Sequence, residues 1–228
     1  MLAFSVFRIL HICSGFLALL IFWIPLVTKK GRKVHRTVGW IYVWAMAIVS
    51  LSAFYMGAYR VLFDETAAHE LISFSWFLIF ISILSGATAW YGIRVLHFKQ
   101  RKERHRHIFD LFVSSLLVGS GVGISLYGFS INSPLIAYFP LLGIFIGVLQ
   151  LLYWLRKPSQ RMHWYYEHFG GMIPCCIATV TAFTVFGAPR LLNIETTSIF
   201  LWFLPTILLV PVLIGFQIYY NNKFSKSF

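Results

Sequence analysis

Apolar residues run along this chain in seven long stretches that short polar or charged segments separate. A helix needs about 20 apolar residues to cross the hydrocarbon core of a bilayer, and each stretch reaches that length. The pattern therefore predicts an all-α bundle of seven transmembrane helices, forming a single domain over residues 1–228. The predicted helices cover residues 4–27, 37–58, 71–93, 108–130, 134–155, 164–187 and 197–220.

Composition agrees with this prediction, because 59% of the residues are hydrophobic and only 11% are charged. Soluble domains carry about 25% charged residues. We expect the first apolar stretch to be a retained helix rather than a cleaved signal peptide, since it is long and lacks a small-x-small site before the basic residues. No disulfide framework is expected, because the cysteines lie inside apolar stretches, at Cys13, Cys175 and Cys176.

The basic residues predict the orientation of the chain. Most of the 19 Lys and Arg residues fall in the loops 28–36, 94–107 and 156–163 or in the C-terminal tail, which alternate helices would place on one side. Cytoplasmic loops carry such an excess, so we expect the N-terminus outside and the C-terminus in the cytoplasm. This distribution also argues against nucleic-acid binding and for contact with anionic lipid. The predicted outer side holds Arg8, Arg60 and Arg190 with Asp64, Glu65, Glu70 and Glu195.

Two acids are predicted at the cytoplasmic ends of helices, and each shares a helix face with a histidine. His107 and Asp110 are three residues apart, and His163 and Glu167 are four apart. With His35, this set suits a divalent ion such as Zn²⁺, Fe²⁺ or Mn²⁺ and leaves a position open for water or substrate. Ionisable groups in membrane helices are functional candidates by default.

The leading hypothesis is therefore a membrane-embedded metal site near the cytoplasmic face. His168 points about 140° away from His163 on an ideal helix, so it is a substitute or supporting ligand. Such a site could serve an oxidoreductase or a hydrolase acting on an apolar or lipid-like substrate, with Glu167 as catalytic general base. The predicted metal ligands are His35, His107, Asp110, His163, Glu167 and His168.

Other interpretations of these residues stay open. Acids in a first helical turn are favoured by the helix dipole, and Asp110 and Glu167 could pair with Arg106 and Arg161. A second hypothesis is a transmembrane electron carrier with haem b. His11 and His69 would bind the outer haem, and an inner pair would come from the set His35, His107 and His168. A third is a non-catalytic transporter, sensor or accessory subunit.

Several membrane-protein classes do not fit the sequence. The last predicted helix has no lysine for retinal and no paired histidines like those of the zinc-containing receptor and ceramidase group. No H-x-x-H-H tract resembles a desaturase, and no helix carries an arginine at every third position, as a voltage sensor would.

Small residues recur at positions where helices could approach closely. Ser115, Gly119 and Gly123 are spaced by four residues, which predicts a central place for this helix in the bundle. Gly143 and Gly147 predict a similar seam in the next helix. Such faces could also support a homo-oligomer or a membrane complex.

The segments RILHICSGFLALL and KKGRKVHRTVGWIYVWAM resemble the bacterial membrane-protein family named domain of unknown function 2306. The matching features are His11, Gly15, Gly39 and the stretch from Lys29 to Arg36. The histidine-rich segment before residue 108 and the segment HWYYEHFGGM are similar to family members as well. The resemblance implies a multi-pass protein of the bacterial inner membrane with no assigned reaction, and it supports His11 and His35 as positions of interest.

Overall fold

The computed structural model describes residues 2–193 and 198–225, with side chains up to residue 222. Within these residues the chain is helical and contains no strand. Some predicted features lie outside the described residues. They are the first residue of the last predicted helix, 197, and two of the charged residues, Glu195 and Lys226. The side chain of Lys223 is also outside. The helices are α1 (Leu2–Ile21), α2 (Trp23–Val27), α3 (Lys33–Phe63), α4 (His69–Arg94), η1 (Val95–Phe98), α5 (Ile108–Ser130), α6 (Pro134–Tyr138), α7 (Pro140–Leu155), α8 (His163–Ala182), η2 (Phe183–Gly187), α9 (Ala188–Leu192) and α10 (Phe200–Ser225).

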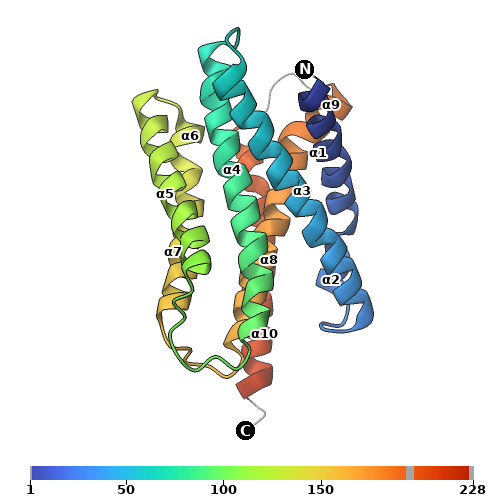
Figure 1. Cartoon of the computed structure of the whole chain (residues 1–228). Helices are drawn as coiled ribbons and strands as arrows, with labels where there is room; N and C mark the ends of the chain where they lie inside the picture. Colours follow the sequence, from blue (N-terminus) through green and yellow to red (C-terminus); the bar gives the residue numbers. More distant parts are fainter. Residues whose placement is uncertain (1, 194–197, 226–228) are drawn as a thin grey trace. The chain divides into compact units, whose positions relative to one another are not determined.

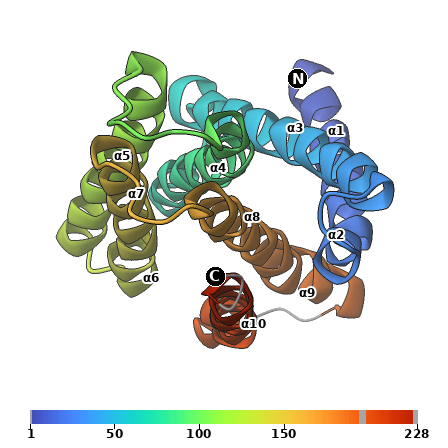
Figure 2. The same cartoon turned by 90° about the horizontal axis from the view of Figure 1, so that it is seen from below.

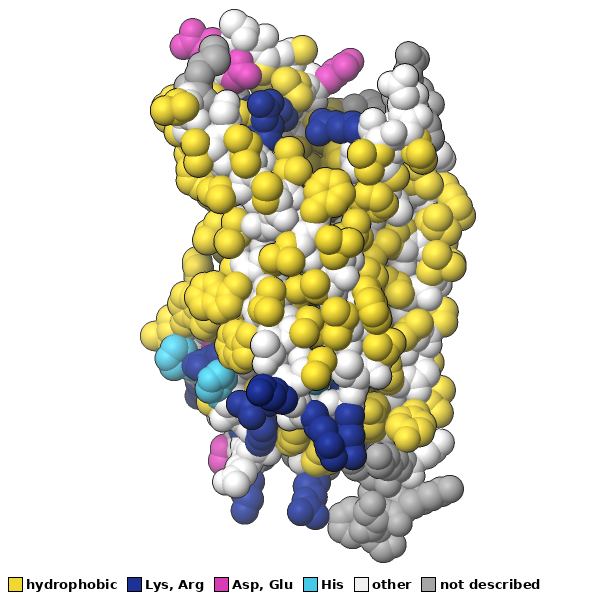
Figure 3. Space-filling view, turned by 90° about the vertical axis from the view of Figure 1, so that its right-hand side faces the viewer, with side chains coloured by type: hydrophobic (Ala, Val, Ile, Leu, Met, Phe, Trp, Pro, Cys, Tyr) yellow, Lys and Arg dark blue, Asp and Glu magenta, His cyan; other side chains and the backbone are white. Residues whose placement is uncertain are grey.

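The prediction of seven apolar helices is confirmed by length and composition. In the described part of the chain, seven helical segments are long and apolar enough to cross a membrane, and each overlaps one predicted range. On the side of α1 and α3 that Figure 3 presents, hydrophobic side chains cover the middle of the surface. Large apolar side chains of α1 and α3 such as Leu51, Leu62 and Ile9 are exposed, as expected for helices that face lipid tails. The spans are Leu2–Val27, Lys33–Phe63, His69–Phe98, Ile108–Ser130, Pro134–Leu155, His163–Leu192 and Phe200–Asn222.

The chain divides into two compact units, which we describe separately. Unit 1 comprises Met1–Ala87 and Glu103–Lys157, and unit 2 comprises Thr88–Lys102 and Pro158–Phe228. The continuous helix α4 contributes its longer part to unit 1 and its last turns to unit 2.

Helix α4 is a central element of unit 1. On one side, a Cβ at Gly57 of α3 would lie 2.7 Å from the Ile79 side chain. On the other side, the fully buried Phe80 ring fits against Gly143 of α7, where a Cβ would lie 2.6 Å from it. Helices α5 and α7 lie side by side in this unit (Figure 1). The absence of side chains at these glycines thus allows close contact between the helices.

The predicted seam of Ser115, Gly119 and Gly123 on α5 is wrong, whereas the seam of Gly143 and Gly147 on α7 is confirmed. A Cβ at Gly119 or Gly123 would meet no atom within 4 Å, while one at Gly147 would lie 2.7 Å from Val118. The face of α5 that packs runs through other residues, namely Ser114, Leu117, Gly121, Ser125 and Gly128. The spacing of four was right, but the helix is rotated so that a different set of small residues is buried.

In unit 2, α8 packs against the last turns of α4 and against α10. A Cβ at Gly171 would lie 2.8 Å from the Cα of Gly92, so the two backbones are in direct contact. Figure 2 shows α8 and α10 side by side. The rings of Tyr165 and Tyr220 meet edge to face at 4.8 Å between centroids. These contacts fix the position of the first turns of α8, which carry the predicted site residues.

Candidate functional site

Asp110 lies in the first turn of α5, as predicted, and its side chain is completely buried. Its Oδ2 accepts a hydrogen bond from Nε2 of His105 at 2.7 Å, and Nδ1 of His107 is 3.7 Å from the same atom. The main-chain N–H of His105 donates to the carbonyl of Trp154 at 2.8 Å. The rings of His105 and Trp154 also pack at 4.6 Å between centroids. The loop before α5 is thus attached to the end of α7 and covers the carboxylate.

The predicted partner of Asp110 was His107, and His105 was not predicted. His107 is exposed and beyond hydrogen-bond distance, whereas His105 makes the direct bond. Helical spacing favoured His107, but His105 precedes the helix in an extended loop to which that spacing does not apply. The density of histidines before Asp110 was the signal that could have indicated it.

Glu167 is held in unit 2 by a residue far away in the sequence. The hydroxyl of Tyr91, on α4, donates to its Oε2 at 2.5 Å, and Tyr91 is buried. The guanidinium of Arg101 also interacts electrostatically with Glu167. The ring of the buried His163 hydrogen-bonds to the main chain of Arg101. Arg101 therefore links the histidine and the acid that the sequence placed on one helix face, and neither it nor Tyr91 was predicted.

His168 points toward α4 in the same unit. Its Nδ1 donates to the main-chain carbonyl of Gly92 at 2.6 Å. This bond depends on the contact between Gly92 and Gly171, which brings the first turns of α8 close to the α4 backbone. A donated Nδ1–H makes Nε2 the lone-pair nitrogen of the neutral ring.

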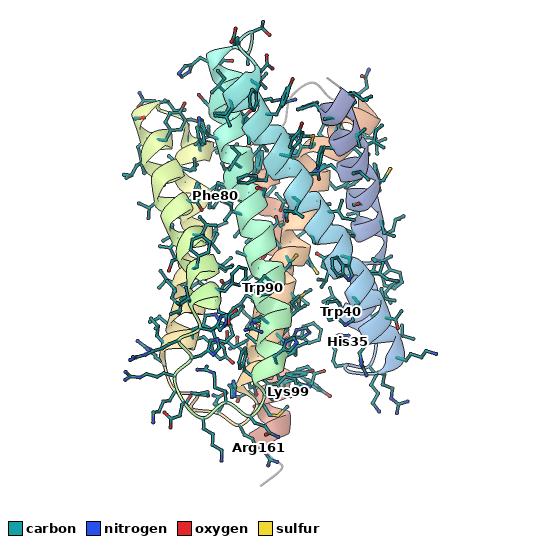
Figure 4. All side chains as sticks on the ribbon, in the orientation of Figure 1. His35, Trp40, Phe80, Trp90, Lys99 and Arg161 are labelled. Atoms are coloured by element: carbon teal, nitrogen blue, oxygen red, sulfur yellow. The ribbon has the colours of Figure 1, made fainter. Side chains whose placement is uncertain are left out.

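His11 and His35, in unit 1, make the same kind of hydrogen bond as His168, from Nδ1 to a main-chain carbonyl. Nδ1 of His11, on α1, donates to the carbonyl of Val49 on α3 at 3.2 Å and lies 3.1 Å from the hydroxyl of Ser52. Nδ1 of His35, labelled at the start of α3 in Figure 4, donates to the carbonyl of Pro25 at 3.1 Å. The ammonium of Lys30 donates to the same carbonyl at 2.7 Å. Burial lowers the pKa of Lys30, which lies in the loop between the first two spans.

His69, the second predicted outer ligand, lies at the start of α4 and is exposed. Its Nδ1 is 3.4 Å from the hydroxyl of Ser73, which also hydrogen-bonds to the hydroxyl of Tyr127 at 2.7 Å. His69 therefore lacks the main-chain carbonyl contact that orients His11.

The predicted metal ligands fall into separate local groups. His35, His107 and Asp110 belong to unit 1, and His163, Glu167 and His168 belong to unit 2. Among the described residues, no group of three His, Cys, Asp or Glu side chains is placed to hold a metal ion. The convergence of both sets on one ion stays a prediction.

Comparison with known proteins supports the membrane assignment. The family model described as "Predicted membrane protein (DUF2306)" matches residues 8–89, a range that contains His11 and His35. The resemblance stated above is thus confirmed for this part of the chain. No curated protein and no solved structure matches the chain.

Proposed function

We propose that this multi-pass membrane protein binds a haem-type cofactor through histidine side chains and carries electrons. The observation that supports the proposal is the shared geometry of His11, His35 and His168, in which Nδ1–H donates to a main-chain carbonyl. Histidines that ligate metals usually have this arrangement, because it fixes the tautomer and directs Nε2 toward the metal.

A haem-type cofactor fits the described residues better than a bare ion. An ion held by protein ligands alone needs at least three donors, and the described residues contain no such group. A haem supplies four nitrogen ligands itself and takes only one or two axial ligands from the protein. In this proposal His11 and His35 are the candidate axial ligands in unit 1, and His168 is the candidate in unit 2.

The acids have a supporting part in this proposal. Asp110 and Glu167 each accept a hydrogen bond from a neighbouring side chain. Glu167 is linked to the proposed cofactor only indirectly, as the sequence neighbour of His168 on α8. In the divalent-ion alternative below, Glu167 would be the general base toward a bound substrate, with Tyr91 holding it in place.

A divalent ion such as Zn²⁺ or Fe²⁺ is the second candidate. The observation that favours it is the position of two imidazole nitrogens, at 2.7 and 3.7 Å from the same oxygen of Asp110. Further ligands would have to come from the other predicted residues, and an oxidoreductase or hydrolase acting on an apolar substrate would follow from that site.

Location and assembly belong to the same proposal. The basic loops support an orientation with the N-terminus outside, and the family match supports a membrane location, for which we propose the bacterial inner membrane. Gly119 and Gly123, which lie exposed on α5, supply a small-residue face through which copies of the chain or a partner could associate.

An absorption spectrum of detergent-purified protein from haem-supplied cells tests the proposal. We expect a Soret band that weakens in His11→Ala, His35→Ala and His168→Ala. His97→Ala, at an exposed histidine of η1, is the matched control and should leave the band unchanged. Absence of the band, or a band insensitive to all three substitutions, would contradict the proposal.

Metal analysis of the same samples separates the alternatives. About one Zn or Fe per chain without a Soret band, lost in Asp110→Asn, would support the ion site. If neither metal nor haem is found, co-purifying partners together with tolerance of alanine at all inner histidines would favour a non-catalytic transporter, sensor or accessory subunit.

A further inference from the structure

A basic pocket lies at the loop end of unit 2. It is an open hollow of about 640 Å³ between Lys99–Lys102, which follow η1, and Pro158–Trp164, which lead into α8. Figure 4 labels Lys99 and Arg161 at this end of the unit. The lining residues all belong to the described part of the chain, and none of them is acidic. Four are permanently cationic: Lys99, Arg101, Lys102 and Arg161.

The pocket combines exposed and half-buried positive charges. Lys99, Lys102 and Arg161 are exposed, so their head groups can turn toward a ligand. Arg101 is half-buried, and its charge also acts on Glu167. The Lys99 ammonium lies 4.8 Å from the centroid of the Trp164 ring, which forms an aromatic part of the lining. The first turn of α8 also borders the pocket, and its dipole adds to the positive potential.

This combination of side chains suits a phosphate group. Guanidinium groups bind phosphate oxygens in a two-pronged manner, and lysines add point charges around them. Basic residues beside an interfacial tryptophan are also the setting in which membrane proteins meet anionic headgroups. We propose that the pocket binds the phosphate of an anionic ligand, which is either an anionic phospholipid headgroup or a soluble phosphate ester. This site goes beyond the proposed cofactor function, since it uses neither His11 nor His35.

Equilibrium binding to the detergent-purified full chain tests the pocket. The probes are radiolabelled phosphatidylglycerol, phosphatidylcholine as the neutral lipid, and glycerol 1-phosphate as the soluble ester. The pocket variant combines Lys99→Gln, Lys102→Gln and Arg161→Gln. The matched control removes three exposed charges from the first basic loop and the start of α3, with Lys29→Gln, Lys33→Gln and Arg36→Gln.

We expect the pocket variant to bind its phosphate ligand on the order of a hundredfold more weakly, since each charge near a headgroup contributes about fivefold. The control should change the affinity less than about threefold. Phosphatidylglycerol binding without glycerol 1-phosphate binding identifies a lipid, and binding of both identifies a site for the headgroup itself. The single variants Lys102→Gln and Arg161→Gln should each lose about fivefold, which keeps the test valid if the triple variant misfolds.

Three results would overturn the proposal. They are binding of neither anionic probe, equal binding of phosphatidylcholine, and an equal loss of affinity in the pocket and control variants. The last result would mean that the basic loops attract anions without a specific pocket.

Discussion

Asp110 in unit 1 and Glu167 in unit 2 both lie near the start of a long apolar helix, yet they are held in different ways. The Asp110 side chain is 0% exposed, and its hydrogen-bond donor, His105, is five positions away in the sequence. Glu167 is half-buried, and its donor, Tyr91, is 76 positions away. One acid is covered by its own loop, whereas the other is positioned by the packing of α8 on α4.

The difference separates a structural role from a functional one. Breaking a pair between a fully buried carboxylate and its close partner is strongly destabilising, because the group that is left loses its partner. A half-buried carboxylate that interacts electrostatically with Arg101, a residue lining the basic pocket, can respond to what binds there. We therefore expect substitutions at the Asp110 group to change stability most and substitutions at the Glu167 group to change ligand behaviour.

The largest effect is expected for Asp110→Ala, which should lower the free energy of unfolding by about 3 kcal/mol. The substitution leaves the His105 ring without its carboxylate partner under Trp154. Denaturant unfolding in detergent measures this change in the free energy of unfolding. Glu103→Ala is the control, because its ion pair with Lys157 is exposed, and it should cost less than about 0.5 kcal/mol. An equal loss of unfolding free energy in the two variants would contradict the structural role of Asp110.

Gly171→Ala should lower the stability by about 2 kcal/mol, because the new methyl group would meet the Cα of Gly92 at 2.8 Å. Its neighbour Gly170 is the matched control, since a Cβ there has no atom within 4 Å. Gly170→Ala should be neutral or stabilise by up to about 1 kcal/mol. Thermal unfolding of both variants compares them, and a harmless Gly171→Ala would show that α8 and α4 do not pack as described.

Tyr91→Phe should cost about 1.5 kcal/mol, the typical contribution of a hydrogen bond to a charged group. The change removes only the hydroxyl that donates a hydrogen bond to Glu167. Tyr219→Phe, at an exposed ring on α10, should have no measurable effect on unfolding. An infrared carboxylate band that is absent in Glu167→Gln and shifts in Tyr91→Phe would confirm the contact directly, and an unshifted band would contradict it.

The smallest effect is expected for His107→Ala, within about 0.5 kcal/mol of the wild type. Its side chain is 57% exposed and 3.7 Å from the Asp110 carboxylate. His105→Ala should cost about 2 kcal/mol, since it removes the direct bond to a buried carboxylate. If the two histidines exchange these effects in unfolding measurements, then the sequence-based choice of His107 was right and the described pairing is wrong.

The residues that the sequence missed have a common feature. Tyr91 lies within the predicted helix 71–93 and Arg101 within the basic loop 94–107, and neither stands out there as a site residue. Both are engaged with α8 in the structure, through Glu167 and His163. Their roles depend on contacts between segments far apart in the sequence, which no local spacing indicates.

Helix rotation accounts for the error on α5. The sequence contains two interleaved sets of small residues there, one through Gly119 and Gly123 and another through Gly121 and Gly128. Only the second set is buried. A soluble helix would reveal its buried face by polar residues on the other side, but α5 is apolar on nearly all sides.

The sequence by itself determined the number, length and approximate limits of the membrane helices, because insertion into hydrocarbon depends on the local run of apolar residues. It also located the acids and histidines at helix ends, since polar residues are rare enough in such a chain to stand out. Only the tertiary structure decided which face of each helix is buried and which donor meets each acid. In lipid, apolar side chains are favourable on every side of a helix, so its rotation is set by close packing and hydrogen bonds between helices.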